Sequence, residues 1–356
     1  MKINTSRLRS QRKLDHIKYS VELEDGPVPS GFDDVFLLHQ SIPVCDLEQI
    51  NTTTCFLGKF LRQPLIINAL TGGVDETVKI NKALAEVAKE TGIAMAVGSQ
   101  SAALENAKVA ESFVIVRRVN PEGLILANLS ALIPWKAALQ AVEMICADGL
   151  QLHFNIPQEL IMKEGDRFFG RILDNISEIV ARMPVPVIAK EVGFGFSRET
   201  VFSLFGCGIR VIDIGGQGGT NFIAIEQMRR NQEPISPLSD WGIPTSISLL
   251  ETISTRLPLS IVASGGIRSA LDVAKSLAAG AQAVGVAGPF LRTLIKHSQK
   301  VLENEILSWQ SELQKIMLLV GATNIYQLRS IPIIITGKTK IWLDQRGVSL
   351  LAFGLK

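Results

Sequence analysis

Eight short apolar runs, most of them separated by an amphipathic segment, fill the middle of the chain and restrict its fold more than any other feature. The runs predict strands at residues 65–70, 94–97, 124–128, 149–153, 187–191, 211–214, 259–263 and 283–286. Helical patterns, with apolar residues three and four apart, lie at residues 77–91, 135–146, 171–181, 198–205, 247–256 and 270–279. This order predicts an α/β protein with parallel strands.

Two architectures fit eight such units, a closed (β/α)8 TIM barrel and an open doubly wound sheet. Polar and glycine-rich residues follow nearly every predicted strand, and a barrel builds its binding site from the loops at that end. An open sheet binds its ligand at one crevice, where the strand order reverses. We therefore expect the closed barrel, with an N-terminal extension and a C-terminal helical or irregular tail.

The two ends of the chain do not continue the repeat. We expect residues 1–63 to be an extension that contributes to a substrate site, residues 64–300 to be the barrel, and residues 301–356 to be a tail packed on it, all in one structural domain. The connection between Ile214 and Ile247 is long for a βα loop, and it contains Arg229 and Arg230. Loops of this kind are typical of lids and binding loops.

The composition restricts partners and compartment. A net charge of +2, from 36 basic and 34 acidic residues, predicts no nucleic acid and no anionic membrane as partner. The four cysteines lack a CxxC spacing, which favours buried thiols in a reducing, cytoplasmic compartment. We see no secretory signal and no apolar run of about 18 residues. Barrels with extra terminal segments often associate, so we expect a homo-oligomer that acts on a small molecule.

The densest group of functional side chains lies at the end of the predicted strand 149–153. His153, Asn155, Gln158 and Glu159 surround Pro157, which ends the strand. They offer hydrogen-bond donors, acceptors and one carboxylate, but no nucleophile and no zinc cage. A polar loop with a helix N-cap is the alternative explanation.

Two further groups suit anions. Arg12 and Lys13, with His16 nearby, could bind a diphosphate, although a solvated basic helix face has the same composition. Lys190 ends the fifth predicted strand, where it could stabilise an anionic flavin ring or a substrate oxyanion. A lysine extended along the surface is the alternative. Ser99, after the second predicted strand, and Asn128, at the end of the third, are neutral donors.

Glycine-rich turns follow several strands, at residues 71–73, 215–220, 264–268 and 287–288. Glycine lets backbone N–H groups converge on an anion, and a helix N-terminus adds partial positive charge. The turns after strands seven and eight usually grip a phosphate in this barrel class. Gly265, Gly266, Ala287 and Gly288 therefore indicate a phosphate-bearing ligand, although any single turn of this kind can be purely structural.

Ten stretches span nearly the whole chain, namely RKLDHI (12–17), NALTGG (68–73), AMAVGSQ (94–100), NPEG (120–123), HFNIPQE (153–159), KEVGFG (190–195), GGQGGTNF (215–222), SDWGIPT (239–245), ASGGIR (263–268) and GVAGPFL (285–291). In this order they resemble the FMN-dependent type 2 isopentenyl-diphosphate isomerases. Four positions depart from the family: Leu70 stands where Met is common, Gln100-Ser101 where Thr-His is frequent, and Gly215 where Ser or Ala is common.

The resemblance implies an isomerase of isoprenoid biosynthesis that interconverts isopentenyl and dimethylallyl diphosphate, using Mg²⁺ and FMN reduced by NADPH. It implies that Arg12, Lys13 and His16 hold the diphosphate, that Gln158 contacts the substrate beside the alkene, that Glu159 holds Mg²⁺, and that His153 and Asn155 position the substrate or the metal's waters. The residues implied to line FMN are Ala69, Leu70, Thr71, Ser99, Asn128, Lys190, Thr220, Gly265, Gly266, Arg268, Ala287 and Gly288.

The chemistry agrees with these residues, because a 1,3-allylic proton shift needs proton donors and acceptors but no covalent nucleophile. Either the flavin N5 or Gln158 could carry the proton. A hydride-transferring FMN oxidoreductase is the first alternative, but the four histidines and Cys207 are badly placed for it. A barrel that only binds a prenyl or flavin phosphate is the second, and Gln158, Glu159 and Lys190 argue against it.

Overall fold

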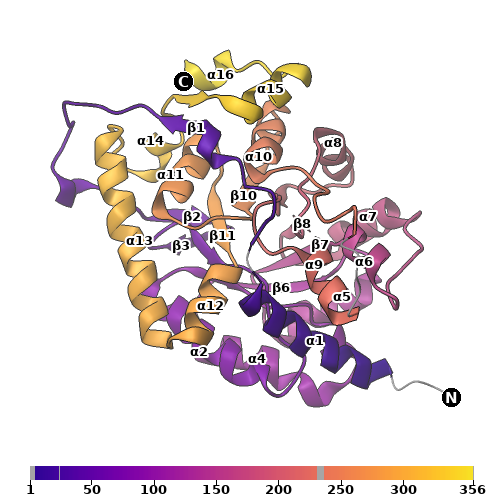
Figure 1. Cartoon of the computed structure of the whole chain (residues 1–356). Coiled ribbons are helices and arrows are strands. Elements are labelled where there is room, and N and C mark those ends of the chain that lie inside the picture. Colours follow the sequence, from indigo (N-terminus) through magenta and orange to yellow (C-terminus); the bar gives the residue numbers. More distant parts are fainter. Residues whose placement is uncertain (1–4, 24, 231–235, 356) are drawn as a thin grey trace.

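The computed structural model describes residues 5–23, 25–230 and 236–355, and its centre is a closed barrel of eight strands (Figure 1). The barrel strands are β4 (Leu65–Ile67), β5 (Ala94–Ala96), β6 (Ile125–Ser130), β7 (Gly149–Phe154), β8 (Val187–Glu191), β9 (Val211–Asp213), β10 (Ser260–Ser264) and β11 (Ala283–Val286). Each strand pairs in parallel with the next, and β11 pairs with β4 to close the ring. The predicted (β/α)8 TIM barrel is confirmed, and the open sheet is excluded.

The helices that follow the strands cover the outside of the barrel, except for α6 and α9, which lie at its mouth. They are α2 (Thr77–Thr91), α3 (Ser101–Glu105), α4 (Glu111–Val119), α5 (Trp135–Met144), α6 (Ile156–Ile161), α7 (Ile172–Arg182), α8 (Arg198–Gly206), α9 (Phe222–Arg230), α10 (Thr245–Ser254), α11 (Ala270–Ala279) and α12 (Gly288–Lys296). The first strand ends at Ile67 rather than at residue 70, so Asn68 to Leu70 are free to face the barrel mouth. Strand β6 instead continues to Ser130.

The N-terminal segment reaches both ends of the barrel. Helix α1 (Thr5–Glu22) contacts α9, α12 and α3. Strands β2 (Thr54–Phe56) and β3 (Lys59–Leu61) form a hairpin, and its Phe56 and Leu61 pack against Ile66 and Leu126 in the barrel interior. The Lys59 ammonium bonds to the carbonyls of Glu122 and Gly123, which precede β6. The hairpin therefore covers the amino-terminal end of the barrel, opposite the functional loops.

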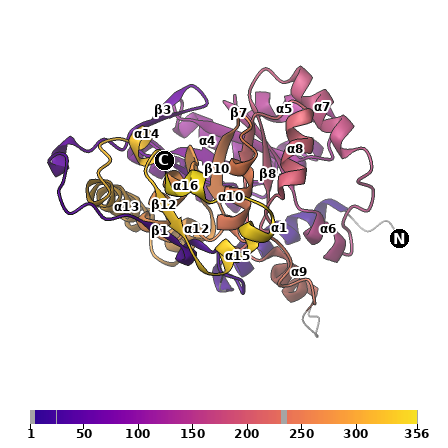
Figure 2. The ribbon, with the colours of Figure 1, turned by 90° about the horizontal axis from the view of Figure 1, so that it is seen from above.

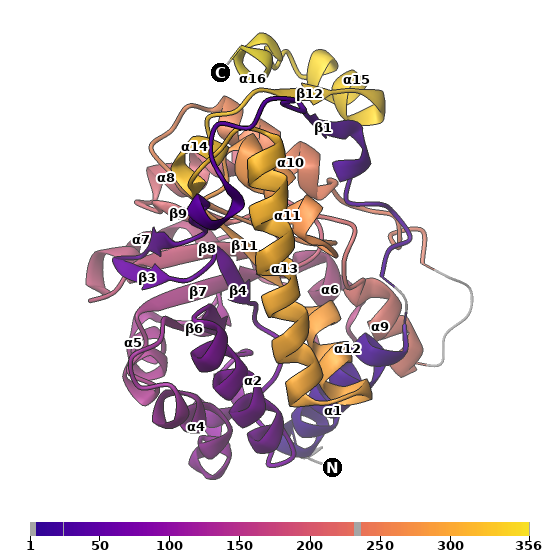
Figure 3. The same cartoon turned by 90° about the vertical axis from the view of Figure 1, so that its left-hand side faces the viewer.

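The C-terminal segment packs on the barrel and on the N-terminal segment. It consists of α13 (Gln299–Leu319), α14 (Ile325–Leu328), β12 (Ile333–Ile335), α15 (Gly337–Gln345) and α16 (Leu351–Gly354). Helix α13 runs along the side of the barrel against α11 and α2 (Figure 3). Strand β12 pairs antiparallel with β1 (Val35–Leu37), and in Figure 2 the two lie side by side. The N-terminal and C-terminal segments are thus joined by a small sheet outside the barrel.

The prediction of buried thiols was wrong. Cys55 and Cys146 are exposed, Cys45 and Cys207 are half-buried, and all four are free. Cys55 lies in the β2–β3 hairpin and Cys146 in the turn after α5, and in both cases the thiol lies at the surface. Within the described ranges, no helix combines the length and the apolar character that a membrane span needs.

Candidate active site

A cavity of about 960 Å³ opens at the carboxyl ends of the barrel strands, beneath α1 and beside α6 and α9. Its size is that of a site for a cofactor-sized molecule. All the residues predicted to form a site line this cavity except Arg268. They are Arg12, Lys13, His16, Ala69, Leu70, Thr71, Ser99, Asn128, His153, Asn155, Gln158, Glu159, Lys190, Thr220, Gly265, Gly266, Ala287 and Gly288.

Arg268 lies behind the glycine turns rather than in the cavity wall. Its guanidinium donates to the carbonyl oxygen of Gly266 at 3.0 Å and to that of Gly218, and it lies 3.4 Å from the carboxylate of Asp25. Arg268 therefore ties two of the glycine turns together, whatever contact it makes with a ligand.

The polar group that follows β7 is held together by its own hydrogen bonds. Asn155 immediately precedes α6, and its Nδ2 donates to Gln158 Oε1 at 3.1 Å and to Glu159 Oε1 at 2.8 Å. The other oxygen of Glu159 accepts from the backbone N–H of Asp166 at 2.9 Å. Pro157 stands in the first turn of α6, where its missing N–H costs no helical bond. The short helix thus holds an amide and a carboxylate at the cavity wall.

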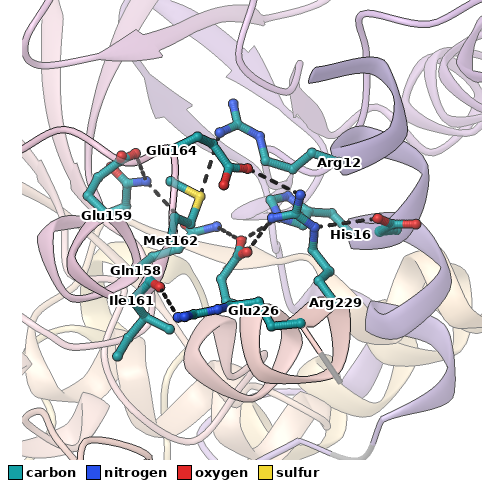
Figure 4. A network of polar contacts seen from close by, with 12 residues as sticks. Arg12, His16, Gln158, Glu159, Ile161, Met162, Glu164, Glu226 and Arg229 are labelled. Carbon is teal, nitrogen blue, oxygen red and sulfur yellow. Dashed lines mark hydrogen bonds and ion pairs between the residues drawn. The ribbon is translucent and has the colours of Figure 1, made fainter. Parts of the chain in front are cut away.

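Sequence reasoning missed Glu226, the centre of this network (Figure 4). Its Oε1 accepts from His16 Nε2 at 2.7 Å and from Gln158 Nε2 at 2.8 Å, and its Oε2 pairs with the guanidinium of Arg229. Burial raises the pKa of Glu226, but hydrogen bonds from His16 and Gln158 and the charge of Arg229 outweigh it and hold the pKa at about 2. The available signal was the glutamate three residues before Arg229 in the long connection.

Helix α1 brings two cations to the cavity. Lys13 donates to the carbonyl oxygen of Ser99 at 2.8 Å, and Arg12 approaches Met162 Sδ at 3.6 Å. Burial lowers the pKa of Lys13 to about 7, and the charge of Arg12 adds to this effect. Burial also lowers the pKa of His16, against the raising effect of Glu226. At neutral pH, His16 is therefore a neutral donor to Glu226. The cationic charge of α1 at the cavity comes from Arg12 and from the protonated fraction of Lys13.

Two further ionisable side chains, Lys190 and His153, lie at the barrel mouth. Lys190 Nζ is 3.3 Å from Asp213 Oδ2, and its side chain is almost fully buried. Burial lowers the pKa of His153 to about 3, and the charges of Lys13, Lys190 and Arg12 lower it further. His153 is therefore neutral across the physiological range, despite its position near the rim.

Close backbone contacts explain the glycines of the predicted phosphate grip. A Cβ at Gly265 would lie 2.1 Å from the carbonyl oxygen of Gly216. Gly215, one of the family departures, has φ of 49°, and a Cβ there would lie 1.8 Å from the carbonyl oxygen of Glu191. The turns therefore bring bare backbone to the cavity next to the first turn of α12, which begins at Gly288. Such an arrangement suits a phosphate.

The sequence is similar to known isomerases over nearly its whole length. A protein of Moorella thermoacetica named isopentenyl-diphosphate delta-isomerase is 52% identical over 338 residues, which cover 95% of this chain and 97% of the relative. A protein of the same name from Geobacillus sp. is 46% identical over 340 residues, again covering 95% and 97%. The family model described as FMN-dependent dehydrogenase matches residues 154–333.

The fold is similar to that of solved flavoprotein structures. A mandelate oxidase variant with a monooxide FMN adduct superimposes with a TM-score of 0.64 at 16% identity, covering 92% of this chain and 99% of the other. Mandelate oxidase with benzoyl-formic acid gives the same TM-score and identity, covering 93% and 98%. At this level of identity the likeness concerns the barrel architecture alone.

Proposed function

The chain belongs to the isopentenyl-diphosphate delta-isomerase family, and on this basis we propose that it interconverts isopentenyl and dimethylallyl diphosphate by a 1,3-allylic proton shift with no net redox change. Reduced FMN and Mg²⁺ would assist the shift, and NADPH would reduce the flavin. The observation that carries the proposal is the assembly of Arg12, Lys13, Gln158, Glu159 and Lys190 around one cavity, which lies in a barrel of the FMN-dependent family.

FMN fits the residues at the barrel mouth. The backbone N–H groups of the turns at Gly265, Gly266 and Gly288 would receive the phosphate, and Lys190 would lie beside the ring. When bound, the reduced flavin supplies an electron-rich ring that can face positive charge and a ring nitrogen that can hold a proton. The protein's contribution is to position the flavin and to exclude water from the cavity.

Mg²⁺ fits Glu159. Magnesium prefers few protein ligands, together with diphosphate oxygens and waters. Within the described ranges, no group of three or more His, Cys, Asp or Glu side chains could hold a metal without a substrate. The single carboxylate, steadied by Asn155 and by the Asp166 N–H, is the donor set expected when the diphosphate supplies the rest.

Gln158 would orient the proton that moves. Glu226 is ionised and can only accept hydrogen bonds, so the Gln158 Nε2 group must face it, and the amide oxygen faces Asn155. Both ends of the amide are thereby fixed beside the space for the alkene. Arg12 and Lys13 would anchor the diphosphate, and the fixed amide would then lie at a constant distance from the reacting carbons.

The test is turnover of isopentenyl diphosphate by the purified protein with FMN, Mg²⁺ and NADPH in the absence of oxygen, beside samples that lack flavin or reductant. We expect dimethylallyl diphosphate only in the complete mixture, with NADPH consumed far below one equivalent per product. No product, together with NADPH oxidation by another acceptor, would instead favour an FMN oxidoreductase, the activity in the description of the matching family model.

A further inference from the structure

A chain of buried polar side chains crosses the barrel interior below the cavity. It joins Asp213 on β9, Asn68 after β4, Gln151 on β7, Asn128 on β6 and His153 on β7. The exposed fractions of Asp213, Gln151, Asn68 and Asn128 are 0%, 1%, 2% and 3%. Asp213 and Gln151 do not line the cavity, so any effect that they have on a ligand passes through the other side chains of the row.

Asp213 sets the donor-to-acceptor direction of the hydrogen bonds along this row of side chains. Its carboxylate lies 3.3 Å from the Lys190 ammonium and accepts from the hydroxyl of Ser264. A carboxylate paired with an ammonium offers acceptors only. Asn68, 2.7 Å from Asp213 Oδ2, must therefore present its Nδ2 group.

Each amide then fixes the next one. Asn68 Oδ1 accepts from Gln151 Nε2 at 3.0 Å, and also from the backbone N–H of Ala69 at 2.9 Å. Gln151 Oε1 accepts from Asn128 Nδ2 at 3.0 Å. Asn128 Oδ1 is left facing His153 Nδ1 at 2.9 Å. An amide oxygen only accepts, so the proton of this last hydrogen bond must belong to the histidine.

If the hydrogen bonds ran in the opposite direction, one acceptor would face another acceptor and one donor would face another donor. If every amide flipped, Asn68 Oδ1 would lie 2.7 Å from a carboxylate oxygen, and its NH₂ group would face the Ala69 N–H. Such contacts in a buried, low-dielectric interior are costly. The buried carboxylate thus favours one direction along the whole chain.

We propose that Asp213, acting through Asn68, Gln151 and Asn128, is a positioning residue that fixes His153 as the tautomer with its proton on Nδ1 and a bare Nε2. The imidazole is neutral, so only one of its nitrogens carries a proton. Within the described part of the chain, no residue hydrogen bonds to Nε2, and His153 lines the cavity. Its lone pair is an acceptor for an O–H or N–H donor in the cavity, and it repels an unprotonated phosphate oxygen.

The tautomer assigned to His153 extends the proposed function. It rests on that function only for the identity of the group that donates to Nε2. A water bound to Mg²⁺ and a flavin N–H share the required chemistry. His153 would then orient such a donor instead of clamping the diphosphate, whose anionic oxygens need the cations of α1.

The first experiment reads the tautomer directly in the full-length, FMN-loaded protein. Solid-state ¹⁵N NMR of protein labelled only at histidine gives separate signals for protonated and bare ring nitrogens. The chain has only four histidines, so single substitutions of His16, His39 and His297 assign the signals. We expect His153 to be protonated at Nδ1 and bare at Nε2 at neutral pH. A proton on Nε2, or on both nitrogens, would overturn the proposal.

Two variants test whether the direction comes from Asp213. In Asp213→Asn the terminal group can donate as well as accept, so only the Ala69 N–H still opposes the reverse direction, which becomes accessible. Gln151→Met cuts the chain and leaves the Lys190–Asp213 ion pair in place, and it also removes the 3.5 Å hydrogen bond from Gln151 Nε2 to Asp213 Oδ2. Its apolar side chain suits the barrel interior, so Gln151→Met provides the test if Asp213→Asn loses FMN. In both we expect the Nε2–H tautomer to appear, and kcat to fall by about tenfold or more with a smaller change in KM.

Ser264→Ala is the matched control, since it removes a donor to Asp213 but leaves the direction of every amide unchanged. It should retain the Nδ1–H tautomer. If Gln151→Met retains only the Nδ1–H form, the assignment to Asp213 is wrong, whether or not the protein turns over isopentenyl diphosphate. The tautomer is measured without turnover, so its failure is distinct from failure of the proposed function.

Discussion

Gln158 donates a 2.8 Å hydrogen bond to Glu226, a residue 68 positions later in the chain. The contact joins α6 to α9, and it fixes the orientation of an amide that points into the cavity. Glu226→Gln removes the fixed acceptor, so the Gln158 amide can rotate. We expect kcat to fall about 100-fold, with a smaller change in KM, in steady-state assays with isopentenyl diphosphate.

Glu164→Gln is the control for this variant. Glu164 is another carboxylate partner of Arg229, at 3.2 Å, but no hydrogen bond joins it to Gln158 in the described residues. Its loss of kcat should be at least about tenfold smaller. Equal losses in the two variants would mean that Arg229, and not the Gln158 amide, is the sensitive group.

Substrate affinity should depend on pH through Lys13. The pKa of this ammonium in the free protein is about 7, and a bound diphosphate raises it. Above pH 7, Lys13 must therefore take up a proton when the diphosphate binds. The KM for isopentenyl diphosphate should therefore rise by up to about tenfold per pH unit above neutrality. Lys13→Arg keeps its charge at every pH used, so its KM should stay flatter over the same range. Parallel profiles for the two proteins would contradict this role.

The dependence on magnesium should change with Glu159. Glu159→Gln replaces a charged ligand by a neutral one, and the Mg²⁺ concentration for half-maximal activity should rise about 10- to 100-fold. Asn155→Ala keeps the carboxylate but removes the 2.8 Å hydrogen bond that steadies it, along with the 3.1 Å bond to Gln158, so its shift in the Mg²⁺ midpoint should be smaller. Titration of chelator-treated protein with MgCl₂ measures both, and an unchanged midpoint in Glu159→Gln would exclude it as a ligand.

Gly215 should tolerate no side chain. Gly215→Ala would bring a Cβ within 1.8 Å of the Glu191 carbonyl oxygen, at a φ of 49°. We expect the free energy of unfolding to fall by more than about 3 kcal/mol in urea titrations. At Gly170 a Cβ would meet nothing within 4 Å, so Gly170→Ala should change stability by less than about 1 kcal/mol.

The C-terminal tail should unfold together with the barrel. The buried Glu251 on α10 accepts from Trp342 Nε1 at 3.0 Å and from Arg346 Nε at 2.9 Å, both from the α15 region. Glu251→Gln should lower the free energy of unfolding by about 3 kcal/mol while calorimetry still records a single transition. A separate transition at lower temperature would mean that residues 301–356 form an independent unit.

Local patterns predicted the barrel because its strands and helices are defined by contiguous residues. Strand β8 and helix α2 have the bounds that the apolar spacing indicated, since burial on every face of a strand leaves a continuous apolar run. The cavity wall was also predictable, because loops after parallel strands meet at one end of a barrel.

Long-range polar contacts were not predictable in this way. Glu226, Asp213 and Gln151 find their partners across 210, 145 and 83 positions, respectively. Nothing in the residues next to Asp213 indicates that its side chain points into the barrel and meets Asn68. The pairing of β1 with β12 is similar, because strands of three residues carry too little pattern to identify a partner from the opposite end of the chain.

The position of α1 has a consequence for the order in which the protein matures. Arg12 and Lys13 are translated before α9 and α12, but α1 packs against these two helices, which end at Arg230 and Lys296. The helix therefore has no complete docking surface until most of the chain has been translated. If Arg12 and Lys13 bind the diphosphate as proposed, the nascent protein should bind it only after this late step, because α1 completes the candidate site after the barrel helices have been translated.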